Sequence, residues 1–144
     1  MFITDKLKSD IEPLLRFLER EADFLRQGID AATAFGPDNR RGLVTRALER
    51  SLHLVIEGIA DVGNTLIDGL IMRDPSSYVD IVAVLLDEQV ISDTLAKDLT
   101  EIMQIRKVLV QDYLADHEQA IYANAHRHAA VDAFVKAVRT YLAP

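Results

Sequence analysis

The chain has 144 residues, of which 49% are hydrophobic and only 6% aromatic, with no tryptophan. This length suits one domain with a buried core, and an aliphatic composition with few aromatics is typical of helical proteins. The absence of cysteine excludes disulfides, thiolate zinc sites and cysteine nucleophiles. A net charge of −7 disfavours general nucleic-acid binding, because phosphate affinity comes from Lys and Arg; a local basic patch for RNA remains compatible with it.

The sequence predicts neither a signal peptide nor a membrane span. The opening segment MFITDKLKSDIEPLL carries acidic residues early and lacks an uninterrupted apolar core, so we expect no signal peptide. No apolar run reaches the roughly 18 residues that a membrane span needs. We therefore expect a cytoplasmic protein.

The first predicted helix covers residues 3–27. Thr4 is its expected N-cap and Gly28 its expected C-cap, while Pro13 should bend the helix or mark a later start. Residues 29–41 are expected to form a loop, because they contain the turn sequence GPDN. One apolar stripe follows from residues at three- and four-residue steps: Leu7, Ile11, Leu14, Leu15, Leu18, Ala22 and Leu25.

The second predicted helix is the longest and covers residues 42–72. Its wide apolar face indicates a helix that packs on two sides. Gly58, Gly63 and Gly69 each cost about 1 kcal/mol relative to Ala in a helix, so they suggest close contact with neighbouring helices. A polar stripe steps along the same helix: Glu57, Asp61, Asn64 and Asp68.

Three further helices are predicted in the second half. Ser77 is expected to cap a short helix that ends near Asp87, and Ser92 to cap the next helix, which runs towards Tyr113. The last helix should cover residues 117–142. No stretch alternates apolar and polar residues long enough for a sheet. The sequence therefore predicts one all-α domain over residues 1–144, an up-down bundle of four main helices plus a short one.

A compact polar set lies at the end of the fourth predicted helix. On a continuous helix, Arg106 and Tyr113 would share a face about 10 Å apart, and Gln111 would lie about 140° away from Arg106. The three converge only if the helix ends near Val110 or if a second chain completes the site. The alternative is an ordinary helix end with a surface arginine.

These residues carry a resemblance. The segment RKVLVQDYL resembles the signature of HepT-like proteins in the HEPN superfamily, in which Arg is followed five positions later by His and then, after one free position, by Tyr. Arg106 and Tyr113 match, Gln111 occupies the His position, and Lys107 follows the Arg. The segments ERSLHLVIEGIADVGNTLID and DPSSYVDIVAVLLDEQVIS resemble the family's second helix, and its short helix and connector. The resemblance spans residues 46–114.

The resemblance implies an all-helical homodimer in which the Arg-His-Tyr sites of two subunits face a shared cleft. Many members are metal-independent ribonucleases that act as toxins. They are commonly paired with a small nucleotidyltransferase antitoxin that can add AMP to the signature Tyr, here Tyr113. The family's polar residues on the second helix, here Glu57, Asp61 and Asn64, lie toward the signature site, and an ion pair that holds Arg106 is the role we favour for them.

Gln111 bears directly on activity. Metal-independent RNA cleavage needs a group that removes the 2′-OH proton and one that protonates the leaving oxygen, and imidazole suits both because its pKa lies near 6.5. The Gln amide does not titrate. We therefore predict a ribonuclease homologue with weakened or absent cleavage, with Arg106, Gln111 and Tyr113 at its site. The alternative is a non-catalytic dimeric module that binds a nucleotide, RNA or a protein.

None of the four histidines is a clear substitute for the imidazole missing at position 111. His53 should lie on a polar edge of the second helix, and His117 reaches the cleft only if the chain bends after Gln111. His126 and His128 lie about 200° apart on a helix, so no spacing matches a pair of metal ligands. A carboxylate pair in the polar stripe is a candidate site for a divalent ion, and the alternatives are a solvated face or hydrogen bonds to neighbouring helices. We expect no metal, no cofactor and no DNA-binding motif.

Overall fold

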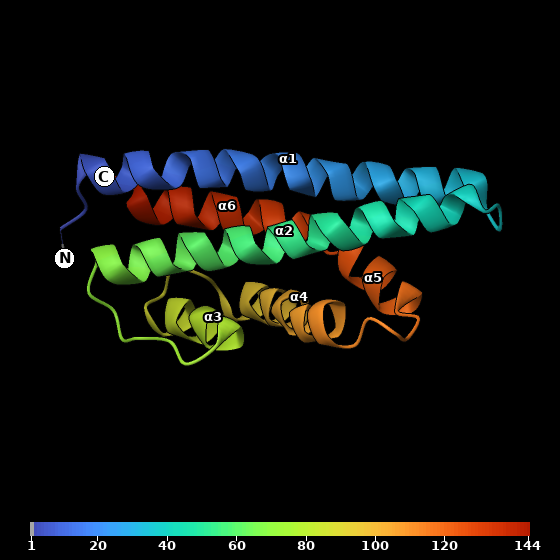
Figure 1. Cartoon of the computed structure of the whole chain (residues 1–144). Coiled ribbons are helices and arrows are strands. Elements are labelled where there is room, and N and C mark those ends of the chain that lie inside the picture. The colour runs from blue at the N-terminus through green and yellow to red at the C-terminus, as the bar shows by residue number, and fades with distance from the viewer. Residues whose placement is uncertain (1) are drawn as a thin grey trace.

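The computed structural model describes residues 2–144, which contain helices and no strands. This confirms the all-α prediction. The helices along the chain are α1 (Asp5–Phe35), α2 (Arg40–Gly69), α3 (Tyr78–Asp87), α4 (Asp93–Gln111), α5 (Glu118–Ala125) and α6 (His128–Leu142) (Figure 1). None of the helices in this described range is both long and apolar enough to span a membrane.

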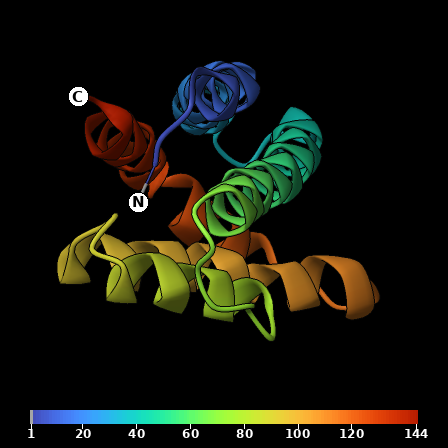
Figure 2. The same ribbon diagram turned by 90° about the vertical axis from the view of Figure 1, so that its left-hand side faces the viewer.

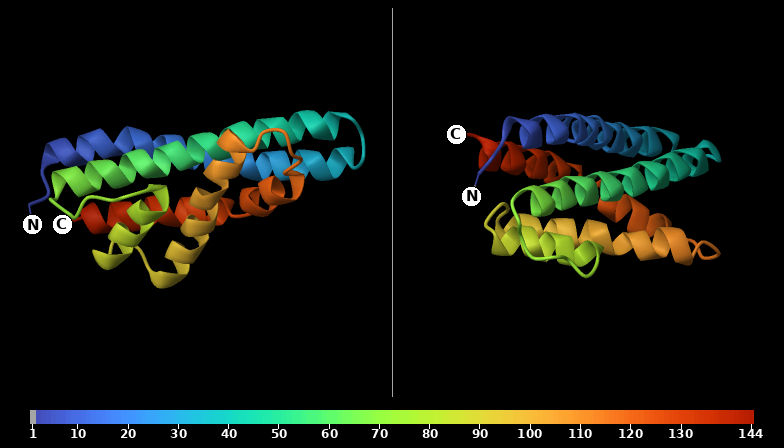
Figure 3. Two further views of the ribbon diagram at one scale, coloured as in Figure 1. Left: turned by 60° about the horizontal axis from the view of Figure 1, so that its bottom comes forward. Right: turned by 60° about the vertical axis from the view of Figure 1, so that its left-hand side comes forward.

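The helices form two layers. The three helices α1, α2 and α6 lie side by side, and the helices α3 and α4 cover one side of this group (Figures 1 and 2). α1 and α2 form a long antiparallel hairpin, whereas α4 crosses beneath α2 at a steep angle (Figure 3). The expected up-down order therefore describes the α1–α2 hairpin, and the α3–α4 pair lies across it.

Side-chain caps begin three of the helices, as the sequence predicts. The hydroxyl of Thr4 accepts a hydrogen bond from the backbone N–H of Leu7 at 3.1 Å. Ser77 does the same for Asp80 at 3.0 Å, and Ser92 for Leu95 at 3.2 Å. Each cap satisfies one of the backbone donors that a helix start leaves free, so these starts are encoded locally.

The end of the first helix was predicted wrongly. Gly28 is not a C-cap, since α1 continues to Phe35 and turns only at Gly36, where φ is +55°. A Cβ on Gly28 would collide with the side chain of Leu48 in α2. The glycine therefore serves close helix packing, and the loop shrinks to the GPDN turn. Pro13 lies inside α1, which neither starts nor stops there.

The last predicted helix is also wrong, because it is two helices. α5 ends at Ala125 and α6 begins at His128. The side chain of Arg127 donates to the carbonyl of Ala123 at 3.3 Å, while buried Asn124 donates to the carbonyl of Ala120 at 2.9 Å. The bond from Arg127 satisfies a carbonyl near the end of α5, where the chain changes direction.

Two further glycines bring helices together around one aliphatic core. A Cβ on Gly58 would lie 2.8 Å from Leu18 of α1, and a Cβ on Gly63 would collide with Ile81 of α3. The predicted close contacts are thus confirmed on two sides of α2. Phe134 of α6 is among the largest fully buried side chains in this core.

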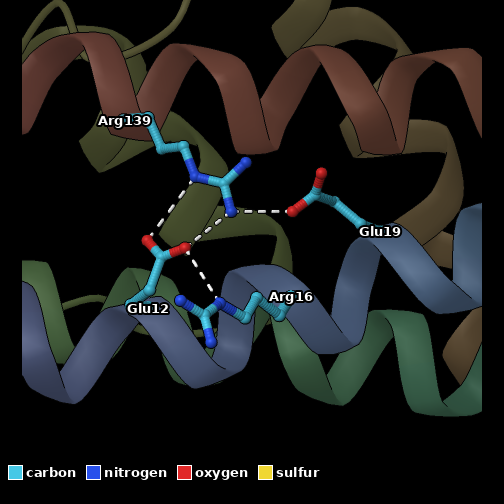
Figure 4. Close-up of polar contacts among 4 residues, drawn as sticks. All are labelled: Glu12, Arg16, Glu19 and Arg139. Atoms are coloured by element: carbon cyan, nitrogen blue, oxygen red, sulfur yellow. Dashed lines mark hydrogen bonds and ion pairs between the residues drawn. The ribbon is translucent and has the colours of Figure 1, made fainter.

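An ion-pair network joins the first helix to the last (Figure 4). Arg139 of α6 donates to Glu12 and to Glu19 of α1, each at 2.7 Å, and Arg16 lies 3.4 Å from the same Glu12 carboxylate. All four side chains are partly exposed. The network therefore joins α6 to α1 by ion pairs.

Candidate functional site

Arg106 lies on α4 where that helix crosses α2. Its Nε donates to Oε1 of Glu57 at 3.3 Å, and about a third of each side chain is exposed. Glu57 is the first residue of the polar stripe predicted from the sequence. The ion pair that we favoured for this stripe is therefore present between Glu57 and Arg106.

Tyr78, the first residue of α3, completes the arrangement. The Arg106 guanidinium carbon lies 4.2 Å from the centre of the Tyr78 ring, and the Tyr78 hydroxyl donates to both Glu57 oxygens at 3.0 and 3.1 Å. Burial, and then the neighbouring Glu57 carboxylate, raise the pKa of the Tyr78 hydroxyl, so it stays protonated as a donor. We refer to Arg106, Glu57 and Tyr78 as the arginine cluster.

His53 borders this cluster on α2. Its Nε2 lies 3.7 Å from Glu57 Oε1, one helical turn along the same helix. The sequence predicted a polar edge for His53, and this position agrees with it. The imidazole and the Arg106 guanidinium approach the same carboxylate oxygen.

Gln111 and Tyr113 lie apart from the arginine cluster within one chain. α4 ends at Gln111, and the side chain of Tyr113 is 76% exposed beyond it. In the described part of the chain, no hydrogen bond or ion pair links either side chain to Arg106. Val110 and Leu114 are exposed beside them. The helix thus ends beside Val110, which was one condition for convergence of the three signature positions, but no hydrogen bond or ion pair joins them within the described residues.

The remaining members of the polar stripe are exposed. Asp61, Asn64 and Asp68 lie on the surface of α2, as a solvated face would. Within residues 2–144, no group of three or more His, Cys, Asp or Glu side chains could hold a metal ion.

His117 follows the bend after α4 but faces another part of the molecule. Its Nε2 lies 2.6 Å from the backbone oxygen of Asp112. It borders a surface pocket of about 720 Å³ together with Arg41 and Tyr122. Arg41 and Glu57 are separated by about 24 Å along α2. His117 is therefore not a substitute imidazole for the arginine cluster in one chain. His126 and His128 flank the break between α5 and α6.

Tyr78 is the member of the cluster that sequence reasoning missed. The cap at Ser77 indicates where α3 begins. It does not indicate which neighbour the first residue faces, because that depends on how α3 packs on α2 and α4. An aromatic residue directly after a cap, opposite an ion pair on two other helices, is a tertiary feature without a local signal.

Comparison with known proteins shows the family of this chain. The family model "Ribonuclease HepT-like" matches residues 10–138 of the chain. The chain belongs to the ribonuclease HepT-like family. A curated relative, "Putative RNase YutE" of Bacillus subtilis (strain 168), is 38% identical over 144 residues, which are 99% of this chain and 92% of the relative. The predicted resemblance is thereby confirmed at the family level.

Solved structures agree with the HepT-like fold. The structure of YutE from Bacillus subtilis, described as a cytosolic protein of unknown function, has a TM-score of 0.75 at 35% identity and covers 99% of this chain and 93% of that chain. A tri-AMPylated HEPN toxin of Shewanella oneidensis, solved in complex with MNT antitoxin, has a TM-score of 0.78 at 17% identity, covering 90% and 96%. At this identity the second similarity concerns the fold.

Proposed function

We propose that this HepT-like chain is a toxin-type, metal-independent ribonuclease homologue that binds RNA phosphate through Arg106 and cleaves weakly or not at all. The observation that carries the proposal is the arginine cluster, which holds one guanidinium at the surface, while the signature His position holds Gln111. A guanidinium fork matches phosphate geometry. The Gln amide does not titrate near neutral pH and so cannot act as a general acid or base, and loss of such a group costs about 10²- to 10⁴-fold in rate.

The proposal includes a homodimer. Gln111 and Tyr113 are exposed at the end of α4, and a site formed by one chain alone leaves them apart from Arg106. The exposed Val110, Tyr113 and Leu114 supply an apolar surface at the same place. A second copy packed there would bring the signature positions of two chains toward one cleft, as the family resemblance implies.

The proposal also includes a partner and a location. The Shewanella oneidensis toxin of the same fold was solved with MNT antitoxin, which supports a nucleotidyltransferase antitoxin as a partner for this chain. Tyr113, at 76% exposure, is accessible for the addition of AMP. Cytoplasmic location is supported by the relative YutE, which is described as cytosolic.

The alternative function is a non-catalytic dimeric module that keeps the cleft to bind a nucleotide, RNA or a protein. Gln111 favours this alternative, because it removes the titrating group but leaves the arginine cluster in place. The two functions differ in one measurable property, which is cleavage of RNA once an imidazole stands at position 111.

The test compares purified parent with Gln111→His on tRNA and total RNA in the presence of EDTA. We expect Gln111→His to cleave about 10²- to 10⁴-fold faster than the parent, and the added Arg106→Ala to abolish that gain. The matched control is Gln104→His, which adds an imidazole at another exposed position of α4.

The outcomes separate the alternatives. Rapid cleavage by the parent, lost in Arg106→Ala, contradicts weakened activity and the binding module together. If neither the parent nor Gln111→His cleaves RNA but both still bind it, the result favours the binding module. A parent that neither cleaves nor binds RNA contradicts the proposed substrate.

A further inference from the structure

Two helices, α2 and α3, hold the guanidinium of Arg106 on α4 from two directions. Glu57 of α2 accepts the Nε–H of Arg106 at 3.3 Å, which fixes one edge of the guanidinium. Tyr78 of α3 lies against its face at 4.2 Å, which restricts rotation of the plane. The hydroxyl of Tyr78 in turn holds both oxygens of Glu57. Tyr78 therefore acts on Arg106 twice, directly through its ring and indirectly through the carboxylate.

This double hold matters because an arginine side chain is otherwise mobile. A free Arg carries about 2 kcal/mol of rotamer entropy, part of which is lost when it binds a ligand. A guanidinium that is already fixed loses less on binding, so preorganisation increases affinity without any new contact. The side chain of Arg106 keeps 34% of its surface exposed, so the fixed group remains accessible.

We propose that Tyr78 is a positioning residue that sets the plane and reach of the Arg106 guanidinium for one phosphodiester of RNA. The inference rests on the proposed function for its ligand, and on the arginine cluster for its geometry. Its ring provides the face contact, and its hydroxyl fixes the carboxylate that holds Nε. Phe at this position keeps the first effect and loses the second, whereas Leu loses both.

The chain contains a matched control for a purely structural role. Tyr122 of α5 also lies against an arginine, with the Arg41 guanidinium carbon 4.8 Å from its ring centre, and its hydroxyl lies 3.0 Å from that of Thr45 on α2. Both tyrosines are partly buried and join neighbouring helices. Only Tyr78 belongs to the arginine cluster. Tyr122→Leu thus reports what the loss of a stacked, hydrogen-bonded tyrosine does by itself.

The first experiment follows the Arg106 Nε–H by ¹⁵N relaxation and hydrogen exchange in the full chain without RNA. We expect a restrained, slowly exchanging Nε–H in the parent. Tyr78→Leu should make it mobile and exchange several-fold faster, and Tyr78→Phe should give an intermediate result. Tyr122→Leu should leave the Arg106 signal unchanged. An equally ordered Arg106 in Tyr78→Leu overturns the proposal whether or not the protein binds RNA.

The second experiment measures binding of a single-stranded RNA oligonucleotide over a series of salt concentrations. We expect Arg106→Ala to weaken binding about tenfold and to reduce the salt slope by about 0.7, the value for one phosphate contact on a single strand. Tyr78→Leu should weaken binding about five- to tenfold in the parent and by less than twofold in the Arg106→Ala background, because it acts through that arginine.

The two experiments distinguish the inference from the function beneath it. Equal effects of Tyr78→Leu in both backgrounds, or the same loss with Tyr122→Leu, overturn positioning and leave the RNA function standing. A parent that does not bind RNA overturns both the proposed function and the RNA phosphodiester as the ligand of Arg106. The Nε–H data then still decide whether Tyr78 fixes the guanidinium.

Discussion

Glu57 is the shared acceptor of the arginine cluster. It receives the phenol of Tyr78 on both oxygens and the Nε–H of Arg106 on one of them. His53 approaches the same oxygen as Arg106. A single carboxylate thus couples residues from α2, α3 and α4, so a change at any of the donors alters what the others can do.

The chemistry of the cation is testable at Arg106. Arg106→Lys keeps the charge but loses the Nε–H bond to Glu57, the planar stack on Tyr78 and the two-pronged contact with phosphate. We expect RNA affinity to fall about fivefold or more, close to the loss in Arg106→Ala. Fluorescence anisotropy with a labelled RNA measures this. The neighbouring Lys107→Arg serves as the control and should change affinity by less than twofold; full affinity in Arg106→Lys would show that charge alone suffices.

The sequence predicted part of this site. An ion pair from the polar stripe of the second helix to Arg106 was expected, because both carry the family resemblance. The stripe did not indicate that Glu57 pairs with Arg106 while Asp61 and Asn64 stay on the surface. Tyr78 was missed since its role depends on the rotation of α3 about its own axis, which packing determines.

At the scale of elements, glycines decide how closely α2 approaches its neighbours. Gly63 lies under Ile81 of α3, where no Cβ fits without movement of the isoleucine. Gly42, near the start of the same helix, has open space around it. Of these two glycines in one helix, Gly42 has room for a side chain and Gly63 does not.

Alanine substitutions at Gly63 and Gly42 test this difference in available space. Gly63→Ala should lower the free energy of unfolding by about 1–3 kcal/mol through overpacking against α3. Gly42→Ala should raise it by about 0.4–1 kcal/mol, because the unfolded chain loses freedom and nothing collides. Urea denaturation followed by circular dichroism measures both. An unchanged or raised stability of Gly63→Ala would mean that α3 shifts freely, in conflict with its packing on α2.

The same elements show why helix starts were easier to predict than ends. A start with Ser or Thr encodes its own cap, as at Thr4, Ser77 and Ser92. Gly28 looks like an end because glycine is common there, yet its role is contact with Leu48, which is distant in sequence. The break between α5 and α6 carries neither Gly nor Pro. It depends on side-chain bonds of Asn124 and Arg127 that the helical pattern does not reveal.

At the scale of the whole molecule, ion pairs as well as the apolar core join the first helix to the last. Arg139 of α6 bridges Glu12 and Glu19, so the first helix and the last are tied across the full sequence. The hydrogen bond from Arg139 lowers the pKa of the Glu12 carboxyl below its ordinary value of 4.5. Hydrogen bonds to Glu19 and Glu12 raise the pKa of the Arg139 guanidinium, so it stays charged.

The lowered pKa of the Glu12 carboxyl makes the ion pairs between α1 and α6 depend on pH. Because Glu12 binds its proton less readily when folded than when unfolded, its stabilisation is complete above pH 4.5 and is lost as pH falls through the lowered value. Arg139→Gln should therefore reduce stability at pH 7 by about 1 kcal/mol, a modest value because all three side chains are partly exposed to screening solvent. At about pH 3 the difference from the parent should shrink, since protonation of Glu12 weakens the pair in the parent as well.

Chemical denaturation at the two pH values measures this change, with Arg16→Gln as the control. Arg16 contacts the same Glu12 carboxylate only within α1, at 3.4 Å, so its loss should alter stability by no more than about 0.5 kcal/mol. A stability loss in Arg139→Gln that stays the same at both pH values would assign the role of Arg139 to the packing of its aliphatic stem. A loss that shrinks in acid and exceeds that of Arg16→Gln would show that the first and last helices are joined by charge.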